Sequence, residues 1–138
     1  YDGRYVQLTE ARCEPKPVQR PMPPITIGGS GPTRTPRAVA RHAQAWNAIT
    51  RSPTEWQGHH EVLLERCAEI GRDPAEILSS VNARVGKDGT AKDWAARVAD
   101  LAHDYAEVGV GLLVVNVPNP HDPADLEPLA DALRPLAG

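Results

Sequence analysis

The sequence predicts an α/β fold built on a parallel sheet, and two observations carry this prediction. After an irregular N-terminal arm, a strand-like segment followed by a helix-like segment occurs four times. This alternation is typical of parallel strands joined by right-handed crossovers. The segment 110–117 is short and nearly all apolar, as expected of a strand buried on both faces of a parallel sheet. Four units are too few for a closed eight-stranded barrel, but they suffice for half of one or for a small open sheet.

Composition narrows the class of protein. The 138 residues are 41% hydrophobic and 24% charged, which is enough for one globular domain with a core. The net charge of -3 argues against nucleic-acid binding. No run approaches the ~20 apolar residues of a membrane span, so we expect no membrane partner. The two cysteines, Cys13 and Cys67, lack metal-site or disulfide spacing, so we expect reduced thiols in a cytoplasmic protein.

Residues 1–24 are predicted to be an arm and connector, and residues 25–138 the strand–helix body. The chain begins at Tyr1 rather than at Met, and we interpret it as the back half of something larger. The turn signal at Asp2-Gly3 precedes RYVQL, which predicts the second arm of a hairpin whose first arm is not present. The proline-rich run 14–24 should be an extended connector. A docking motif for a proline-binding domain is the alternative interpretation.

The first two strand–helix units have clear start and stop signals. A short strand is predicted over 25–28, and Thr35 fits an N-cap with Pro36 at the first position of a helix over about 36–43. A second strand is predicted over 45–49. The next helix begins at a capping box, Ser52-Pro53-Thr54-Glu55, and ends at Gly71. Its predicted buried stripe is Trp56, His60, Leu63, Cys67 and Ile70.

The last two units follow the same logic. Asp73 to Glu76 should form a short capped turn, and alternating side chains predict a strand over 78–85. Thr90 should cap a long helix that ends at Gly109, and a strand is predicted over 111–117. The PNPHDP segment is a predicted loop. The inward residues of the helix that Thr90 caps are predicted to be Trp94, Val98, Leu101, Ala102, Tyr105 and Val108. A last helix follows the loop, and its predicted inward residues are Leu126, Leu129, Leu133 and Leu136.

The glycine turn at 28–31 is the strongest candidate for a binding site. It stands between a strand and a helix, where backbone N–H groups and the helix dipole favour an anion such as phosphate. Glycine also lets the main chain approach a phosphate closely. An ordinary strand-to-helix turn is the alternative. A dinucleotide-binding loop is disfavoured, because Arg34 stands at the third glycine position and no acid occurs around 49–51.

Other candidate chemistry is weak. His59, His60 and Glu61 are adjacent on a predicted helix and point about 100° apart, so they should not converge on a metal ion. We find no paired carboxylates, no Cys/His pair and no nucleophile signature, so no catalytic residue is predicted. Trp46, a large aromatic residue at a strand end, should cover the core.

Two motifs in combination resemble a known family. The pattern PxPVQxPxPPIxIGGSG, followed by a helix and AxAWN, resembles the C-terminal half of luciferase-like flavin-dependent oxidoreductases and monooxygenases. These are TIM-barrel enzymes that use FMN or the deazaflavin coenzyme F-420. HEVLLERCAEIGRDPAEI resembles the family's helix before the seventh strand, and VGLLVVNVP the eighth strand. The resemblance implies a (β/α)4 half of a TIM barrel.

The resemblance also implies a set of site residues. Backbone amides of Gly28, Gly29, Ser30 and Gly31 would bind the cofactor phosphate, and Trp46 and Asn47 would lie near the flavin ring. Pro36 stands where the family usually has an aliphatic residue, which should make the helix start later or more sharply. Gln44 stands where the family usually has Asp, at a position whose role we expect to be structural.

The resemblance further implies that this chain alone lacks a complete active site, because the first four strands carry much of the substrate pocket. Its partner would be the N-terminal half or a second copy in a two-fold homodimer, since unpaired strand edges and apolar faces associate. The ligand beside the cofactor would be a small-molecule substrate. The alternative function is a non-catalytic half-barrel that serves as a binding or assembly module.

Overall fold

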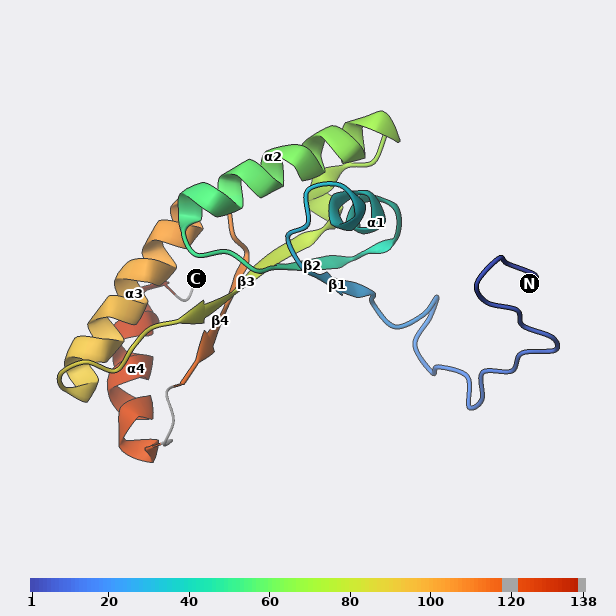
Figure 1. The fold of residues 1–138 in the computed structure, drawn as a ribbon. Helices are drawn as coiled ribbons and strands as arrows, with labels where there is room; N and C mark the ends of the chain where they lie inside the picture. The colour runs from blue at the N-terminus through green and yellow to red at the C-terminus, as the bar shows by residue number, and fades with distance from the viewer. Residues whose placement is uncertain (118–121, 137–138) are drawn as a thin grey trace.

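The computed structural model describes residues 1–117 and 122–136. Its four strands form one parallel sheet in the order β1-β2-β3-β4, and the helices alternate with them along the chain (Figure 1). The predicted fold class is therefore confirmed. The strands are β1 (Thr26–Gly28), β2 (Ala45–Ala48), β3 (Leu78–Arg84) and β4 (Leu112–Asn116). The helices are α1 (Arg34–His42), α2 (Pro53–Glu69), α3 (Ala91–Glu107) and α4 (Leu126–Leu133).

The core lies between the sheet and its helices, which pack in the pairs α1–α2 and α3–α4. Alternate side chains of β2 and β3 are buried in it, and Trp56, Cys67 and Tyr105 join them from the helices. The buried apolar strand residues are Trp46, Ala48, Val81 and Ala83. A sheet buries every second side chain on one face, so these four mark the helix-covered face.

The other face of the sheet is open. Leu78, Leu112 and Val114 point away from the helices and are 48%, 47% and 41% exposed. The prediction that the 110–117 strand is buried on both faces is therefore wrong for this chain. The strand sequence is that of a doubly buried strand, but nothing in the described part of the chain covers its second face.

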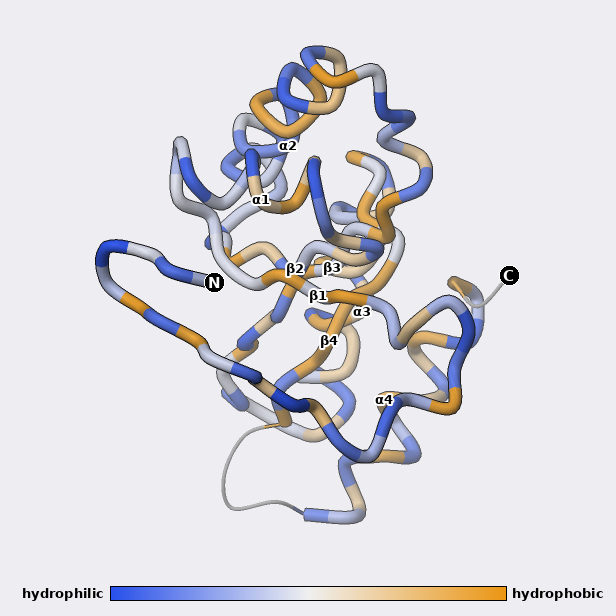
Figure 2. The backbone as a smooth tube through the Cα atoms, turned by 90° about the vertical axis from the view of Figure 1, so that its right-hand side faces the viewer, coloured by the Kyte–Doolittle hydropathy of each residue, from blue (hydrophilic) through white to orange (hydrophobic). Residues whose placement is uncertain are grey.

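The N-terminal arm departs from the prediction. Asp2 and Gln7 form an isolated antiparallel bridge, and the Gly3 N–H donates to the Val6 carbonyl at 2.9 Å. The hairpin thus closes within residues 1–8, with the turn inside RYVQL, and needs no absent first arm. The arm then runs without a helix or strand to residue 25 and extends away from the body (Figure 1). Hydrophilic residues and single hydrophobic residues follow one another along it (Figure 2).

Helix α1 begins earlier than predicted. Thr33, not Thr35, is the N-cap, and Pro36 is buried at the third helical position. Proline is tolerated there because the first N–H groups of a helix have no intrahelical partner. The structural role expected for Gln44 is visible, since its Oε1 accepts from the Ile25 N–H at 2.9 Å. Gln44 therefore ties the start of the sheet to the end of α1.

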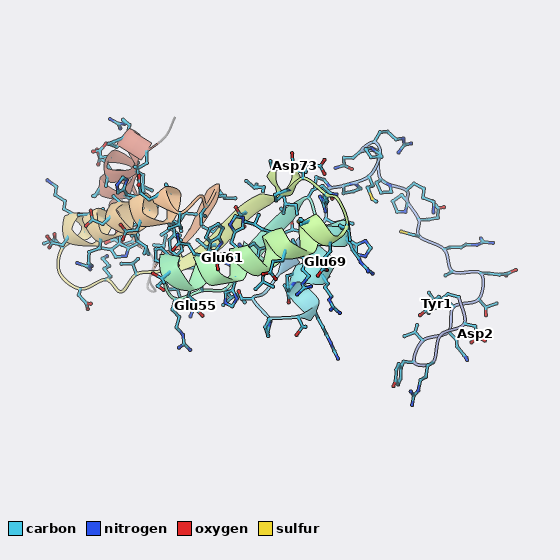
Figure 3. The ribbon with its side chains drawn as sticks, turned by 90° about the horizontal axis from the view of Figure 1, so that it is seen from above. Tyr1, Asp2, Glu55, Glu61, Glu69 and Asp73 are labelled. Atoms are coloured by element: carbon cyan, nitrogen blue, oxygen red, sulfur yellow. The ribbon has the colours of Figure 1, made fainter. Side chains whose placement is uncertain are left out.

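Helix α2 is capped much as predicted. The Ser52 hydroxyl accepts from the Glu55 N–H at 3.2 Å, but the Glu55 carboxylate accepts from the Arg51 N–H instead of returning to Ser52. Gly71, with φ of 67°, follows the helix end. Ile70 is 45% exposed, so its predicted place in the buried stripe is wrong. Figure 3 shows Glu55, Glu61 and Glu69 along the length of α2, with Asp73 beyond its end.

The second half of the body has two polar connections that hold its loops. Thr90 and Asp93 form a reciprocal capping box at the start of α3. Lys87 Nζ lies 2.6 Å from Oδ2 of Asp125, whose side chain is almost fully buried, so the loop after β3 is tied to the start of α4. The predicted loop lies at 118–121 largely outside the described residues, and Leu126 and Leu136 are exposed rather than inward. No helix in the described ranges is long and apolar enough to cross a membrane.

Candidate functional site

Parallel strands end at the same edge of a sheet, and this edge collects most of the polar side chains of the open face. Gly28 ends β1, Arg84 ends β3 and Asn116 ends β4. The registers Gly28↔Asn47 and Arg84↔Asn116 bring neighbouring strand ends side by side. In α/β folds such carboxyl-terminal edges are where ligands bind.

The glycine turn is held in a fixed conformation by the end of β2. The Gly29 N–H donates to the Asn47 carbonyl at 3.0 Å. The Ser30 hydroxyl donates to the Ile49 carbonyl at 2.7 Å and accepts from the Ile49 N–H at 2.8 Å. Gly29 has a φ of 115°, a conformation that side chains with a Cβ rarely adopt. Glycine is therefore required at this position by the backbone itself.

Two predicted phosphate donors remain available. Within the described residues, the N–H groups of Ser30 and Gly31 have no hydrogen-bond partner, whereas that of Gly29 is engaged. A Cβ added at Gly31 would meet Oγ1 of Thr35 at 3.2 Å, so the glycine keeps this approach open. Behind the turn, the space that reaches Trp46 and α2 measures only about 10 Å³. A ligand would therefore meet the turn from the open side.

The start of α1 also fits an anion. Its N-cap, Thr33, makes no side-chain hydrogen bond, and its first turn holds Arg34 and no acidic residue. A helix N-terminus normally recruits a capping oxygen or an acid, since its free N–H groups and dipole are positive there. The residues present thus leave the positive end of α1 uncompensated beside the glycine turn.

Trp46 lies on the helix-covered side of the sheet and is only 3% exposed. Its indole N–H donates to the Gly29 carbonyl at 2.8 Å, and its ring stacks on Trp56 with 6.1 Å between centroids. The expected packing role is thus visible, and Trp46 positions the glycine turn through a hydrogen bond. A contact of this ring with a flavin stays a prediction.

Asn47 is half-buried on the open face and belongs to a chain of polar groups. Its Nδ2 donates to the Ser80 hydroxyl at 2.9 Å, and its Oδ1 accepts from Nδ2 of Asn82 at 2.7 Å. The Ser80 hydroxyl donates in turn to the Trp46 carbonyl at 3.1 Å. These bonds fix the orientation of each amide along the strand ends.

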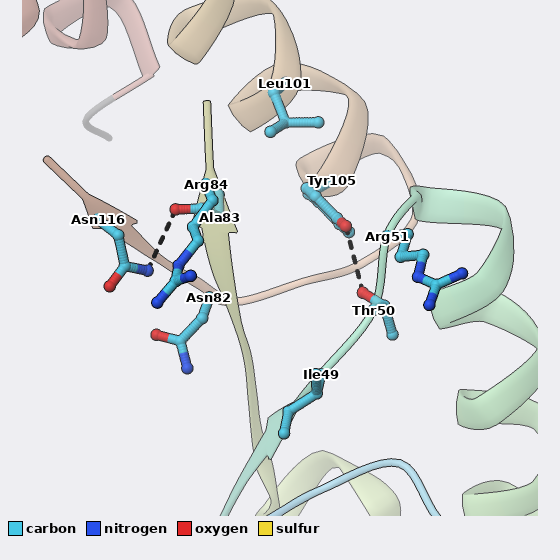
Figure 4. A pocket seen from close by; sticks show the side chains of 9 residues that line it. All are labelled: Ile49, Thr50, Arg51, Asn82, Ala83, Arg84, Leu101, Tyr105 and Asn116. Carbon is cyan, nitrogen blue, oxygen red and sulfur yellow. Dashed lines mark hydrogen bonds between the residues drawn. The ribbon is translucent and has the colours of Figure 1, made fainter. Parts of the chain in front are cut away.

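A cavity of about 600 Å³ opens beside this chain of polar groups (Figure 4). Among the residues that line it, Asn82, Arg84 and Asn116 lie on one side of β3, whereas Thr50 and Tyr105, whose hydroxyls lie 3.2 Å apart, lie on the other side. Asn116 Nδ2 donates to the Ala83 carbonyl at 3.2 Å. The cavity therefore combines polar donors with an aromatic side chain.

Sequence reasoning missed Arg84, Asn82 and Asn116 as site residues. The signal was present, because each stands at or near the C-terminal end of a predicted strand on the face opposite the core. The contacts of Arg72 were also missed. Its guanidinium donates hydrogen bonds to the carbonyls of Val39, Ala40 and Ala43 and so caps the C-terminal end of α1. No local pattern marks a bond across more than 28 residues.

One histidine behind the site has a shifted pKa. His60 stacks on Trp56 with 4.5 Å between ring centroids. Burial lowers the pKa of His60, and the neighbouring Glu61 carboxylate opposes this only in part. His60 therefore takes up a proton less readily in the folded protein than in the unfolded chain.

The comparisons with known proteins bear on the fold. No protein-family model matches the chain, and no curated protein matches it. Among solved structures, this chain is similar to the coenzyme F-420-dependent tetrahydromethanopterin reductase from Methanopyrus kandleri. The alignment covers 100% of this chain, with a TM-score of 0.75 and 15% sequence identity. The chain spans 58% of the length of that protein. The likeness confirms the fold alone, an α/β arrangement of parallel strands and alternating helices that corresponds to part of that structure.

Proposed function

We propose that this chain is part of a luciferase-like oxidoreductase and that its glycine turn binds the phosphate of a deazaflavin or flavin cofactor. The single observation that carries the proposal is the set of unengaged N–H groups of Ser30 and Gly31 beside the uncapped start of α1. Oriented N–H groups and a helix N-terminus together form an anion site. The cofactor, when bound, would supply hydride-transfer chemistry.

Coenzyme F-420 is the cofactor we favour, with FMN as the alternative. The fold neighbour is named for its dependence on coenzyme F-420, and both cofactors carry a phosphate that the turn could hold. Ser30 and Gly31 would bind this phosphate, Trp46 would keep the turn in place, and Asn47 would offer its amide near the ring. These roles concern binding and orientation, so they leave the reaction itself to the cofactor and the substrate.

The chain also needs a cover for its open sheet face. We propose that a complementary half-barrel fills this place, supplied by the rest of a longer chain or by a second copy. Leu78, Leu112 and Val114 form the apolar part of this face, and such patches seldom stay in water. The same patch favours the second candidate function, a half-barrel that serves for binding or assembly only.

Fluorescence titration with coenzyme F-420 and with FMN tests the cofactor site. We expect this chain alone to bind either cofactor weakly, because the complementary half-barrel would supply many of the contacts to the cofactor ring. Gly31→Val should weaken it further, because a branched side chain would fill the space beside Thr35. Gly58→Ala is the matched control, since Gly58 lies exposed in α2 with open space around it. Equal affinities for wild type and Gly31→Val would contradict the proposed site.

A further inference from the structure

We propose that Arg84, Asn82 and Asn116 form a second anion-binding site that receives a carboxylate or phosphate group of the substrate. These residues end two neighbouring strands: Arg84 is the register partner of Asn116, and Asn82 precedes Arg84 by two positions on the same face. Figure 4 shows the guanidinium of Arg84 between the two amides on one side of β3, and all three residues line the cavity.

The charge of Arg84 is not compensated within the described part of the chain. Among the described residues, no carboxylate lies within ion-pair distance of Arg84 and no acceptor takes a hydrogen bond from its guanidinium. The lining of the cavity includes no Asp or Glu, and its other arginine, Arg51, turns its guanidinium away from Arg84 (Figure 4). Arginine at the surface is common, but an arginine without an ion-pair partner beside a polar cavity that has no acid makes the cavity attractive to an anion.

The two amides add donors in fixed directions. An amide NH₂ group has two N–H bonds, and each of these asparagines uses one within the protein. Asn82 donates to Oδ1 of Asn47, and Asn116 donates to the Ala83 carbonyl. With respect to the described residues 1–117 and 122–136, each amide therefore keeps one N–H for a ligand. Together with the planar fork of Arg84, they match an oxyanion, because guanidinium binds carboxylate and phosphate through two parallel hydrogen bonds.

This site is distinct from the glycine turn. The turn follows β1, whereas Arg84 and Asn116 end β3 and β4 in the order β1-β2-β3-β4. Adjacent strands lie about 4.8 Å apart, so β3 is about 10 Å from β1, too far for one phosphate to touch both. A cofactor phosphate at the turn and an acidic substrate group at Arg84 could be bound together. The assignment to a substrate rests on the proposed function, while the anion binding itself does not.

Titration of the isotopically labelled chain with inorganic phosphate, and separately with acetate, tests the site by NMR. We expect the side-chain NH₂ signals of Asn82 and Asn116 to shift in at least one series, and the tighter series identifies the preferred anion. Arg84→Ala should weaken this binding about tenfold or more, as loss of a charged hydrogen bond requires. Arg84→Lys keeps the positive charge but not the planar guanidinium. It should bind the anion more weakly than the wild type and more tightly than Arg84→Ala.

Arg12→Ala is the control, because Arg12 is an exposed arginine in the arm, and it should bind like the wild type. The proposal is overturned if Asn82 and Asn116 do not respond to either anion, or if Arg84→Ala leaves their response unchanged. Shifts confined to Ser30 and Gly31 would overturn it while supporting the cofactor site. The reverse pattern, with shifts only around Arg84, would support it and count against the glycine turn.

Discussion

The indole N–H of Trp46 donates a hydrogen bond of 2.8 Å to the carbonyl oxygen of Gly29. This bond connects the buried core to the turn that we propose as a phosphate site. The core residue is packed between sheet and helices, and the turn lies at the edge of the sheet. The position of the turn therefore depends on a side chain that no ligand needs to touch.

Trp46→Phe should keep most of the ring packing and remove this bond. We expect the free energy of unfolding to fall by about 1–2 kcal/mol, because a hydrogen bond is lost and its partner is left unpaired. Urea unfolding measures the loss. Trp94→Phe is the matched control, since Trp94 is equally buried and donates to the Val85 carbonyl at 2.9 Å. Both variants should be destabilised, but only Trp46→Phe should shift the amide signals of Ser30 and Gly31.

Gly29→Ala tests the backbone requirement of the turn. At a φ of 115° a Cβ is strained, so the variant should lose about 1 kcal/mol or more of stability. Gly58→Ala should instead gain about 0.5–1 kcal/mol, because Gly58 lies exposed inside a helix. Thermal or urea unfolding compares them. If both substitutions stabilised the chain, the strained turn would be refuted.

His60 should make stability depend on pH. The pKa of His60 in the folded protein lies below its unfolded value of 6.5. As the pH falls, the unfolded chain is therefore protonated at His60 before the folded protein is. The stabilising contribution is complete above pH 6.5, declines below it, and stops declining once the folded protein is also protonated. His60→Gln should flatten this decline in urea unfolding. Identical pH profiles for wild type and His60→Gln would rule the mechanism out.

The open sheet face should drive self-association of the isolated chain. Light scattering should detect a dimer, whose interface should exceed about 1,000 Å² in total. Leu112→Lys with Val114→Lys should shift it toward monomer, because charge would then stand in the apolar patch. Leu64→Lys, an exposed leucine on α2, should have no such effect. A monodisperse wild-type monomer at high concentration would show that another arrangement protects this face.

The strands and helices could be predicted because their signals are local. Caps at Ser52, Thr90 and Asp73 and the stop at Gly71 all act within a few residues, and the structure has each of them. The start of α1 was misplaced because both Thr33 and Thr35 can cap a helix. Burial of Ile70 was misjudged because the helix ends just before it.

The site could be predicted only in part, because it is assembled by contacts between strands. The glycine turn was found from its own residues. Nothing near Gly29 in the sequence indicates that its N–H is taken by the Asn47 carbonyl, which leaves Ser30 and Gly31 as the available donors. The group around Arg84 depends on the register between β3 and β4, which no local pattern sets.

The most direct test of the account is a residue-resolved NMR titration of the chain with coenzyme F-420 and with FMN. We predict weak binding, with the amide signals of Ser30 and Gly31 among the largest shifts and with coenzyme F-420 the tighter ligand. Gly31→Val should abolish those shifts. If either cofactor binds with its shifts elsewhere, or if neither moves Ser30 and Gly31 at any concentration, the glycine turn is not a cofactor-phosphate site.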